Sequence, residues 1–188
     1  EKVISINPNY YLAYFMLGNI YQDLKNYKKA INYYNKVFIY DKNNLNTMNN
    51  MGKIYFELKK YDKAINYFEK CISLNKSTKY LNNLALIELK LGEIYKSKLL
   101  LEEALTLEPN NILSHWNLMN NIPLIIKNEK QINDIRNNFK KKLNEIENLI
   151  KKNKYTKDLL LQTILSSTNF GLHYQCILDL ELNKKYAS

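Results

Sequence analysis

Apolar and small residues recur along the first 111 residues with a period of about 34 positions. Three consecutive segments carry the pattern: residues 11–44, 45–77 and 78–111. Each has an aromatic residue, Leu or Met at its fourth position, Leu or Met at its seventh, and Gly or Ala at its eighth. The twentieth position is again small and the twenty-fourth is bulky. Self-similarity at this period indicates a repeat architecture.

The spacing of these positions predicts two packed helices in each segment. The small residues are Gly18, Gly52 and Ala85 at the eighth position and Ala30, Ala64 and Ser97 at the twentieth, and the bulky ones are Tyr34, Phe68 and Leu101. Positions four, seven, eight and eleven share one face of a helix with 3.6 residues per turn. Small residues let two antiparallel helices approach to about 8 Å, and the bulky residue fills the groove beside them. One such hairpin leaves apolar surface bare, so we expect the segments to stack.

The pattern resembles the tetratricopeptide repeat over about the first 120 residues. The resemblance implies an all-α fold: a right-handed superhelix (α-solenoid) followed by a C-terminal helical segment. Pro109 occupies the thirty-second position of the third segment, and Pro8 has the same relation to the segment that starts at residue 11. Residues 1–10 are therefore expected to be the end of an earlier repeat, in a chain that is a piece of a longer array. The predicted domains are an array over 1–122, made of the partial unit 1–10, the units 11–44, 45–77 and 78–111 and a degenerate unit 112–122, and a helical linker or cap over 123–188.

The resemblance also implies that the first helix of each repeat lines a concave inner face, through its second, fifth, sixth, ninth, twelfth and thirteenth positions. The sixth-position residues are Met16, Asn50, Asn83 and Asn117, and their fifth-position neighbours include Asn49, Asn82 and Trp116. A carboxamide both donates and accepts hydrogen bonds, as a peptide backbone requires of its partner. We therefore expect an asparagine ladder that binds an extended peptide in the groove. The alternative is a chance alignment in an asparagine-rich chain.

Residues 123–188 are predicted to form further helices. Pro123 cannot lie inside a continuing helix, so the fourth hairpin is expected to stop there. Asn128 with Gln131 forms a capping-box pattern. The long amphipathic helix that follows presents one apolar face, made of Ile132, Ile135, Phe139, Leu143, Ile146 and Leu149. Two more helices are expected over 156–167 and 175–186.

The C-terminal part of the chain resembles one region of the SPINDLY-like O-linked N-acetylglucosamine transferases, the region that joins the repeats to the catalytic domain. The resemblance lies in "IPLII…INDIRNNFKKKL…TNFGLHYQ…DLELNKKY". The matching residues are Pro123, Arg136, Phe139, Thr168, Asn169, Phe170, Tyr174, Gln175, Asp179, Leu180, Leu182 and Tyr186. Gly171 and Cys176 depart from the pattern, where an aromatic residue and a glycine are expected. The asparagine ladder also resembles the one in this transferase family. The resemblance implies that the repeats present substrate proteins to a downstream glycosyltransferase domain.

The chain itself has no motif for catalysis or for a cofactor. It contains no β-α-β pattern and no glycine loop for phosphates, so this chain alone is not expected to transfer sugar. His173 and Cys176 are two potential ligands, too few for a zinc site. Cys71 and Cys176 form no disulfide framework and suit a reducing compartment. Of the adjacent His115 and Trp116, one is expected in the core and the other facing the groove.

Charge and hydropathy limit the classes of partner that this chain is expected to bind. The chain of 188 residues is 46% apolar, has a net charge of +10, and contains no apolar run of the roughly 18 residues that cross a membrane. Residues 1–126 hold 16 Lys and Arg against 11 Asp and Glu, and residues 127–188 hold 12 against 7. The excess is spread along the chain, which favours an ordinary solvated surface over a nucleic-acid site. We expect a cytoplasmic scaffold that binds a protein or peptide. The alternatives are a stand-alone adaptor, which assembles partners through its convex face, and an RNA-binding repeat.

Overall fold

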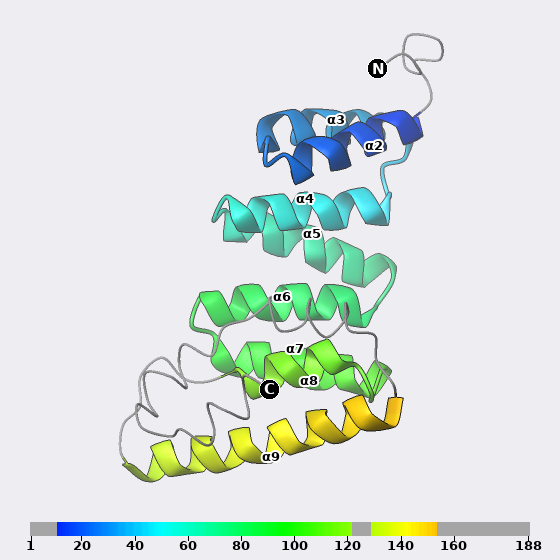
Figure 1. The fold of residues 1–188 in the computed structure, drawn as a ribbon. Helices are drawn as coiled ribbons and strands as arrows, with labels where there is room; N and C mark the ends of the chain where they lie inside the picture. The colour runs from blue at the N-terminus through cyan, green and yellow to red at the C-terminus, as the bar shows by residue number, and fades with distance from the viewer. Residues whose placement is uncertain (1–10, 122–128, 154–188) are drawn as a thin grey trace. The chain divides into compact units, whose positions relative to one another are not determined.

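The computed structural model describes residues 11–121 and 129–153, which form eight helices and no strand (Figure 1). These are α2 (Tyr11–Asp23), α3 (Tyr27–Tyr40), α4 (Leu45–Glu57), α5 (Tyr61–Leu74), α6 (Thr78–Lys90), α7 (Ile94–Leu107), α8 (Ile112–Met119) and α9 (Glu129–Asn153). The all-α fold expected from the repeat is confirmed. The partial unit 1–10 and the helices expected over 156–167 and 175–186 lie outside the described residues.

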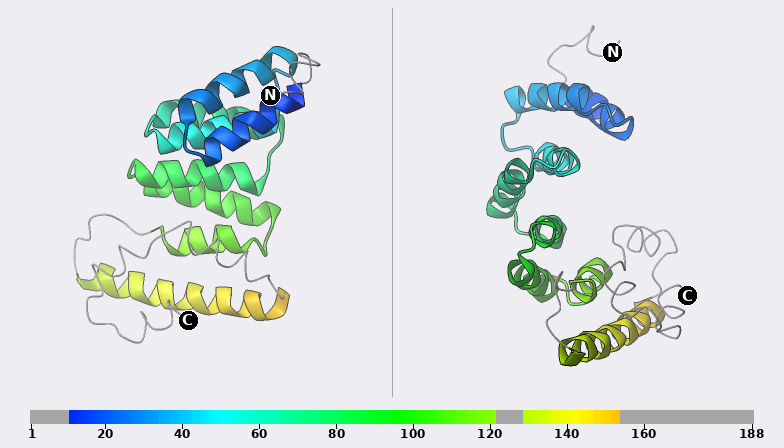
Figure 2. Two further views of the ribbon diagram at one scale, coloured as in Figure 1. Left: turned by 45° about the horizontal axis from the view of Figure 1, so that its top comes forward. Right: turned by 90° about the vertical axis from the view of Figure 1, so that its left-hand side faces the viewer.

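The chain divides into two compact units, Glu1–Ile87 and Glu88–Ser188. Unit 1 holds α2 to α5 and most of α6, whereas unit 2 holds α7, α8 and α9. Within unit 1 the first helices of the repeats, α2, α4 and α6, lie on one side, and the second helices, α3 and α5, lie on the other (Figure 2). Residues that point outward from the first helices therefore share one side of unit 1.

The helix pairs of unit 1 approach closely where the repeat has glycine. A Cβ atom built on Gly18 would overlap the ring of Tyr34, and one on Gly52 would lie 2.8 Å from Cζ of Phe68. Both rings are almost fully buried. The eighth and twenty-fourth positions therefore pack against each other in the first two repeats, as the spacing predicted.

Asparagine is the N-cap residue of three helices. The side-chain oxygens of Asn26, Asn44 and Asn111 accept the backbone N–H three residues later, at 3.2, 2.9 and 3.0 Å. These caps satisfy N–H groups that have no partner inside the helix. Part of the asparagine content of this chain thus serves helix starts.

The first helix of each repeat ends in the same turn. At the fifteenth position, Lys25, Lys59 and Gly92 have φ angles of 55°, 57° and 83°. The N–H of the next residue bonds the carbonyl five residues back, at 2.8 Å in all three repeats. This left-handed C-terminal turn is a Schellman motif, a position that favours glycine because a Cβ atom is strained there. Only the third repeat has glycine at this position.

In unit 2 the apolar stripe of α9 packs on α8. Phe139, Leu143 and Ile146 are buried against a group from α8, namely Ile112, Trp116 and Met119. The long amphipathic helix expected after Pro123 is confirmed by α9. Its neighbour α8 has only 8 residues.

We expect Lys25→Gly and Lys59→Gly each to raise the free energy of unfolding by about 1 kcal/mol, because glycine removes the left-handed strain. Urea unfolding followed by circular dichroism measures the change. Lys70→Gly is the matched control: Lys70 is exposed in the interior of α5, where glycine should cost about 1 kcal/mol. Equal destabilisation by Lys25→Gly and Lys70→Gly would contradict this account of the turn.

Candidate functional site

A buried tyrosine organises the polar side chains of the first two repeats. Tyr34 on α3 has no exposed surface, and its hydroxyl lies 2.7 Å from both Asn19 Oδ1 and Gln22 Oε1 on α2. The same hydroxyl accepts a hydrogen bond from Nδ2 of Asn50 on α4, at 3.1 Å. Burial raises the pKa of Tyr34 to about 12, an effect that the Asn50 hydrogen bond opposes and the charge of Asp23 reinforces. The hydroxyl thus stays protonated and joins three helices.

A chain of amides continues from this tyrosine to the third repeat. Asn50 Nδ2 donates to Asn19 Oδ1 at 2.9 Å, and Asn49 Nδ2 donates to Asn50 Oδ1 at 3.3 Å. Asn83 Nδ2 on α6 then donates to Asn49 Oδ1 at 3.1 Å. All these bonds run in one direction, from α6 through α4 to α2. The amides of three consecutive repeats are therefore held in fixed orientations.

The structure separates the asparagines of the predicted ladder by exposure. Asn50 and Asn83 are half-buried on the first-helix side of unit 1, and Met16 is 58% exposed there. Asn49 and Asn82 are almost fully buried, and Asn82 Nδ2 donates to the Thr78 carbonyl at 2.9 Å. The fifth-position asparagines are therefore placed to position their neighbours rather than to contact a partner.

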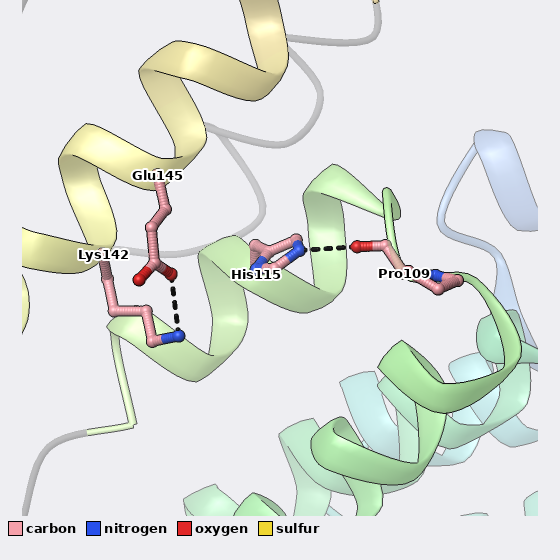
Figure 3. Close-up of polar contacts among 4 residues, drawn as sticks. All are labelled: Pro109, His115, Lys142 and Glu145. Atoms are coloured by element: carbon pink, nitrogen blue, oxygen red, sulfur yellow. Dashed lines mark hydrogen bonds and ion pairs between the residues drawn. The ribbon is translucent and has the colours of Figure 1, made fainter.

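The remaining predicted residues lie in unit 2. Trp116 is 4% exposed and belongs to the cluster between α8 and α9. Asn117 is half-buried on α8. His115 Nε2 donates to the Pro109 carbonyl at 2.8 Å, while Lys142 and Glu145 of α9 form an ion pair nearby (Figure 3). Trp116 is thus the core member of the His115–Trp116 pair.

Two lysines share the first-helix side of unit 1 with the amides. Lys53 lies one turn after Asn50 on α4, and Lys79 lies one turn before Asn83 on α6. Desolvation lowers the pKa of the Lys53 ammonium, and the positive charge of Lys79 lowers it further. We call Met16, Asn19, Asn50, Lys53, Lys79 and Asn83 the first-helix face.

Sequence reasoning missed the partners that hold this face together. Asn19 and Gln22 occupy inward positions of the first repeat, and Tyr34 stands where the later repeats have Phe68 and Leu101. The sequence did carry one signal for this network: Tyr34 places a hydroxyl at a repeat position that is otherwise apolar, and Asn19 and Gln22 are amides on the preceding helix.

Among the described residues, neither the potential metal ligands nor the cysteine points to a reactive site. They include no group of three or more His, Cys, Asp or Glu that would hold a metal ion. Burial raises the pKa of the Cys71 thiol to about 11, which makes it a poor nucleophile. None of their helices has the length and apolarity needed to span a bilayer.

Two tetratricopeptide-repeat family models match this chain, one over residues 12–77 and the other over 78–111. Together they span more than half of its length, and the chain belongs to the tetratricopeptide-repeat family. The expectation from the 34-residue period is confirmed. No curated protein matches the chain.

Solved structures share the fold. MamA is 21% identical, with a TM-score of 0.65 over 82% of this chain and 86% of MamA. YrrB, described as a protein of this repeat class with an unusual peptide-binding site, is 16% identical, with a TM-score of 0.59 over 98% of this chain and 89% of YrrB. The first such domain of Spaghetti (RPAP3), bound to the HSP90 peptide SRMEEVD, is 26% identical, with a TM-score of 0.50 over 69% of this chain and 90% of that domain.

We expect Tyr34→Phe to lower the free energy of unfolding by about 1–3 kcal/mol, because the amides around the missing hydroxyl lose their partner. The raised pKa of Tyr34 adds a pH dependence. The stabilisation that the protonated Tyr34 hydroxyl contributes is complete below pH 10, the ordinary pKa of tyrosine. It is lost as the pH rises towards 12. Urea unfolding of both proteins, followed by circular dichroism of the helices at pH 7 and near pH 11, tests both effects. The difference between wild type and Tyr34→Phe should shrink at the higher pH, and a constant difference would contradict this role.

Proposed function

We propose that this chain is a protein-interaction scaffold that binds extended peptide segments along the first-helix face of unit 1. The observation that carries the proposal is the amide chain from Asn83 to Asn19, which crosses three consecutive repeats. Neighbouring first helices are roughly 10 Å apart, a distance that about three residues of an extended peptide span. Asn50 and Asn83 are the half-buried rungs that would contact the peptide backbone.

Three further points support this proposal. Repeat arrays of this class typically use extended surfaces of stacked helices to bind partners. The similar RPAP3 domain is described as bound to a peptide. Preorganised amides also favour binding, because their side-chain entropy is already lost before the peptide arrives.

A second candidate places the chain in a longer enzyme. The resemblance of residues 122–188 to the linker of SPINDLY-like O-linked N-acetylglucosamine transferases favours it, and the repeats would then present substrate proteins to a catalytic domain. Most of the matching residues, from Thr168 to Tyr186, lie outside the described part of the chain. The proposal therefore depends on sequence resemblance alone.

To test the scaffold, we expect the whole chain to select members of a random, unstructured peptide library. The double variant Asn50→Ala and Asn83→Ala should weaken binding of the selected peptides about tenfold or more, since each lost amide contact costs about 1 kcal/mol. Fluorescence anisotropy with labelled peptides measures the affinity.

Asn32→Ala with Asn66→Ala is the matched control for this experiment. Both residues are exposed and occupy the same position of the second helices α3 and α5. If this control weakens binding and the first-helix variant does not, partners bind the opposite side, as in the adaptor alternative. Circular dichroism confirms that each variant remains folded.

For the enzyme, the coding sequence downstream of residue 188 is the deciding measurement. We expect it to continue into a two-lobed α/β domain with a phosphate-binding glycine loop. A stop codon or an unrelated segment at this point would exclude the transferase.

A further inference from the structure

We propose that the exposed face of α7 is a self-association surface, on which α7 of a second copy of this chain packs antiparallel. The surface, which we call the α7 strip, consists of Tyr95 and Leu99 and the charged residues beside them, namely Lys96, Lys98, Glu102 and Glu103. Two features carry the inference: apolar side chains that the other repeats lack, and an order of charges that is complementary to its own reverse.

Exposed apolar side chains distinguish α7 from the second helices of the other repeats. Tyr95 and Leu99 lie one turn apart and are 72% and 47% exposed. The first two repeats have exposed charged or polar residues at both positions, namely Lys28, Asn32, Asp62 and Asn66. The repeat fold therefore does not require apolar residues at these positions. Exposed apolar side chains that lie together favour a protein contact, and tyrosine is enriched among the residues that dominate the binding energy of interfaces.

Charge changes sign along the strip at Leu99. Lys96 and Lys98 precede this residue, whereas Glu102 and Glu103 follow it. A helix with 3.6 residues per turn places Lys96 and Glu103 on one side of the apolar pair, and Lys98 and Glu102 on the other. The N-terminal half of the strip is therefore basic on both sides, and the C-terminal half is acidic on both sides.

A second α7 that lies antiparallel matches this order. With the two-fold axis at Leu99, Lys96 faces Glu103 of the second copy on one side, and Lys98 faces Glu102 of the second copy on the other. Because the contact is two-fold symmetric, each of these pairs forms twice. The two Leu99 side chains meet at the axis, with Tyr95 beside them. A parallel arrangement would place like charges opposite each other, which opposes binding.

The ion pairs within a single chain do not prevent this arrangement. Lys96 Nζ lies 3.5 Å from Glu93 Oε2, and Lys98 Nζ lies 3.6 Å from Glu102 Oε1. All four side chains are about half-exposed, and exposed ion pairs contribute little to stability. Exchanging them for pairs between copies therefore costs little, while the burial of Tyr95 and Leu99 favours association. One helix per copy is a small contact, so we expect a dissociation constant on the order of 100 μM.

Sedimentation equilibrium of the whole chain, from about 1 μM to about 1 mM, tests the proposal. A reducing agent is present, so that no disulfide between copies contributes. The average mass of wild type should rise with concentration from that of one chain towards twice that value. The variant Tyr95→Lys with Leu99→Asn carries the residues of the first repeat at these positions, and it should weaken association about tenfold or more.

Ile39→Lys with Leu74→Asn is the matched control. It makes the same replacements on α3 and α5, at side chains that are 72% and 48% exposed. It should leave the association unchanged. Circular dichroism of each variant confirms that its helices are intact.

Charge reversal tests the antiparallel arrangement. Lys96→Glu alone and Glu103→Lys alone should each weaken self-association about tenfold, because like charges then face each other twice in the dimer. An equal mixture of the two single variants should associate as wild type does, since every such contact in a mixed dimer again joins opposite charges.

A single-chain mass at every concentration would overturn the proposal and leave a different protein as the occupant of the α7 strip. Unchanged association of the Tyr95→Lys and Leu99→Asn variant would overturn it as well, because the contact would then lie elsewhere on the chain. If both charge variants lose association and their mixture does not recover it, the antiparallel arrangement is wrong.

Discussion

The structure of unit 1 depends on how closely the two helices of a repeat approach each other. The contact is made where a glycine on the first helix faces a large ring on the second, as Gly18 faces Tyr34 and Gly52 faces Phe68. A side chain on either glycine would have to displace a buried ring. The first helices of successive repeats lie on one side (Figure 2), and the close contact within the first repeat brings the Tyr34 hydroxyl within reach of Asn19 and Gln22. The eighth and twenty-fourth positions of the first repeat thus determine both the packing of its two helices and the hydrogen bonds of Tyr34.

The polar side of unit 1 follows from that alignment. Once α2, α4 and α6 lie on one side, their amides are neighbours and hydrogen-bond to one another across repeats. Buried polar groups need partners, so the network stabilises the fold as well as orienting its exposed members. Amides that bond to each other keep fewer groups for a ligand. Among the described residues, the NH₂ of Asn19 remains a donor, whereas both N–H groups of Asn50 are used and Asn83 keeps its Oδ1 as an acceptor. The lysines beside them add positive charge to the same surface.

Much of this fold was predictable from periodicity. The helix pairs, the small eighth position and the amphipathic α9 all follow from residue size and spacing, which act locally. The candidate site was predictable only as a set of positions. Asn49, Asn50, Asn82 and Asn83 are adjacent pairs of identical residues, and nothing in their order says that Asn49 and Asn82 are buried while Asn50 and Asn83 reach the surface. Lys25 and Lys59 were missed for a similar reason, since a lysine does not signal a left-handed turn as Gly92 does.

The sequence by itself indicated a tetratricopeptide-repeat protein, because small and bulky residues recur at fixed places about every 34 residues, as stacked helix pairs require. The tertiary structure decided which polar side chains reach the surface of unit 1 and which atoms bond to one another. Hydrogen-bond direction and electrostatic proximity depend on atoms from different repeats. Asn19 and Asn50 are 31 residues apart in the chain and 2.9 Å apart between their bonded atoms. Such pairings arise only when the helices are packed, and they leave no trace in local sequence.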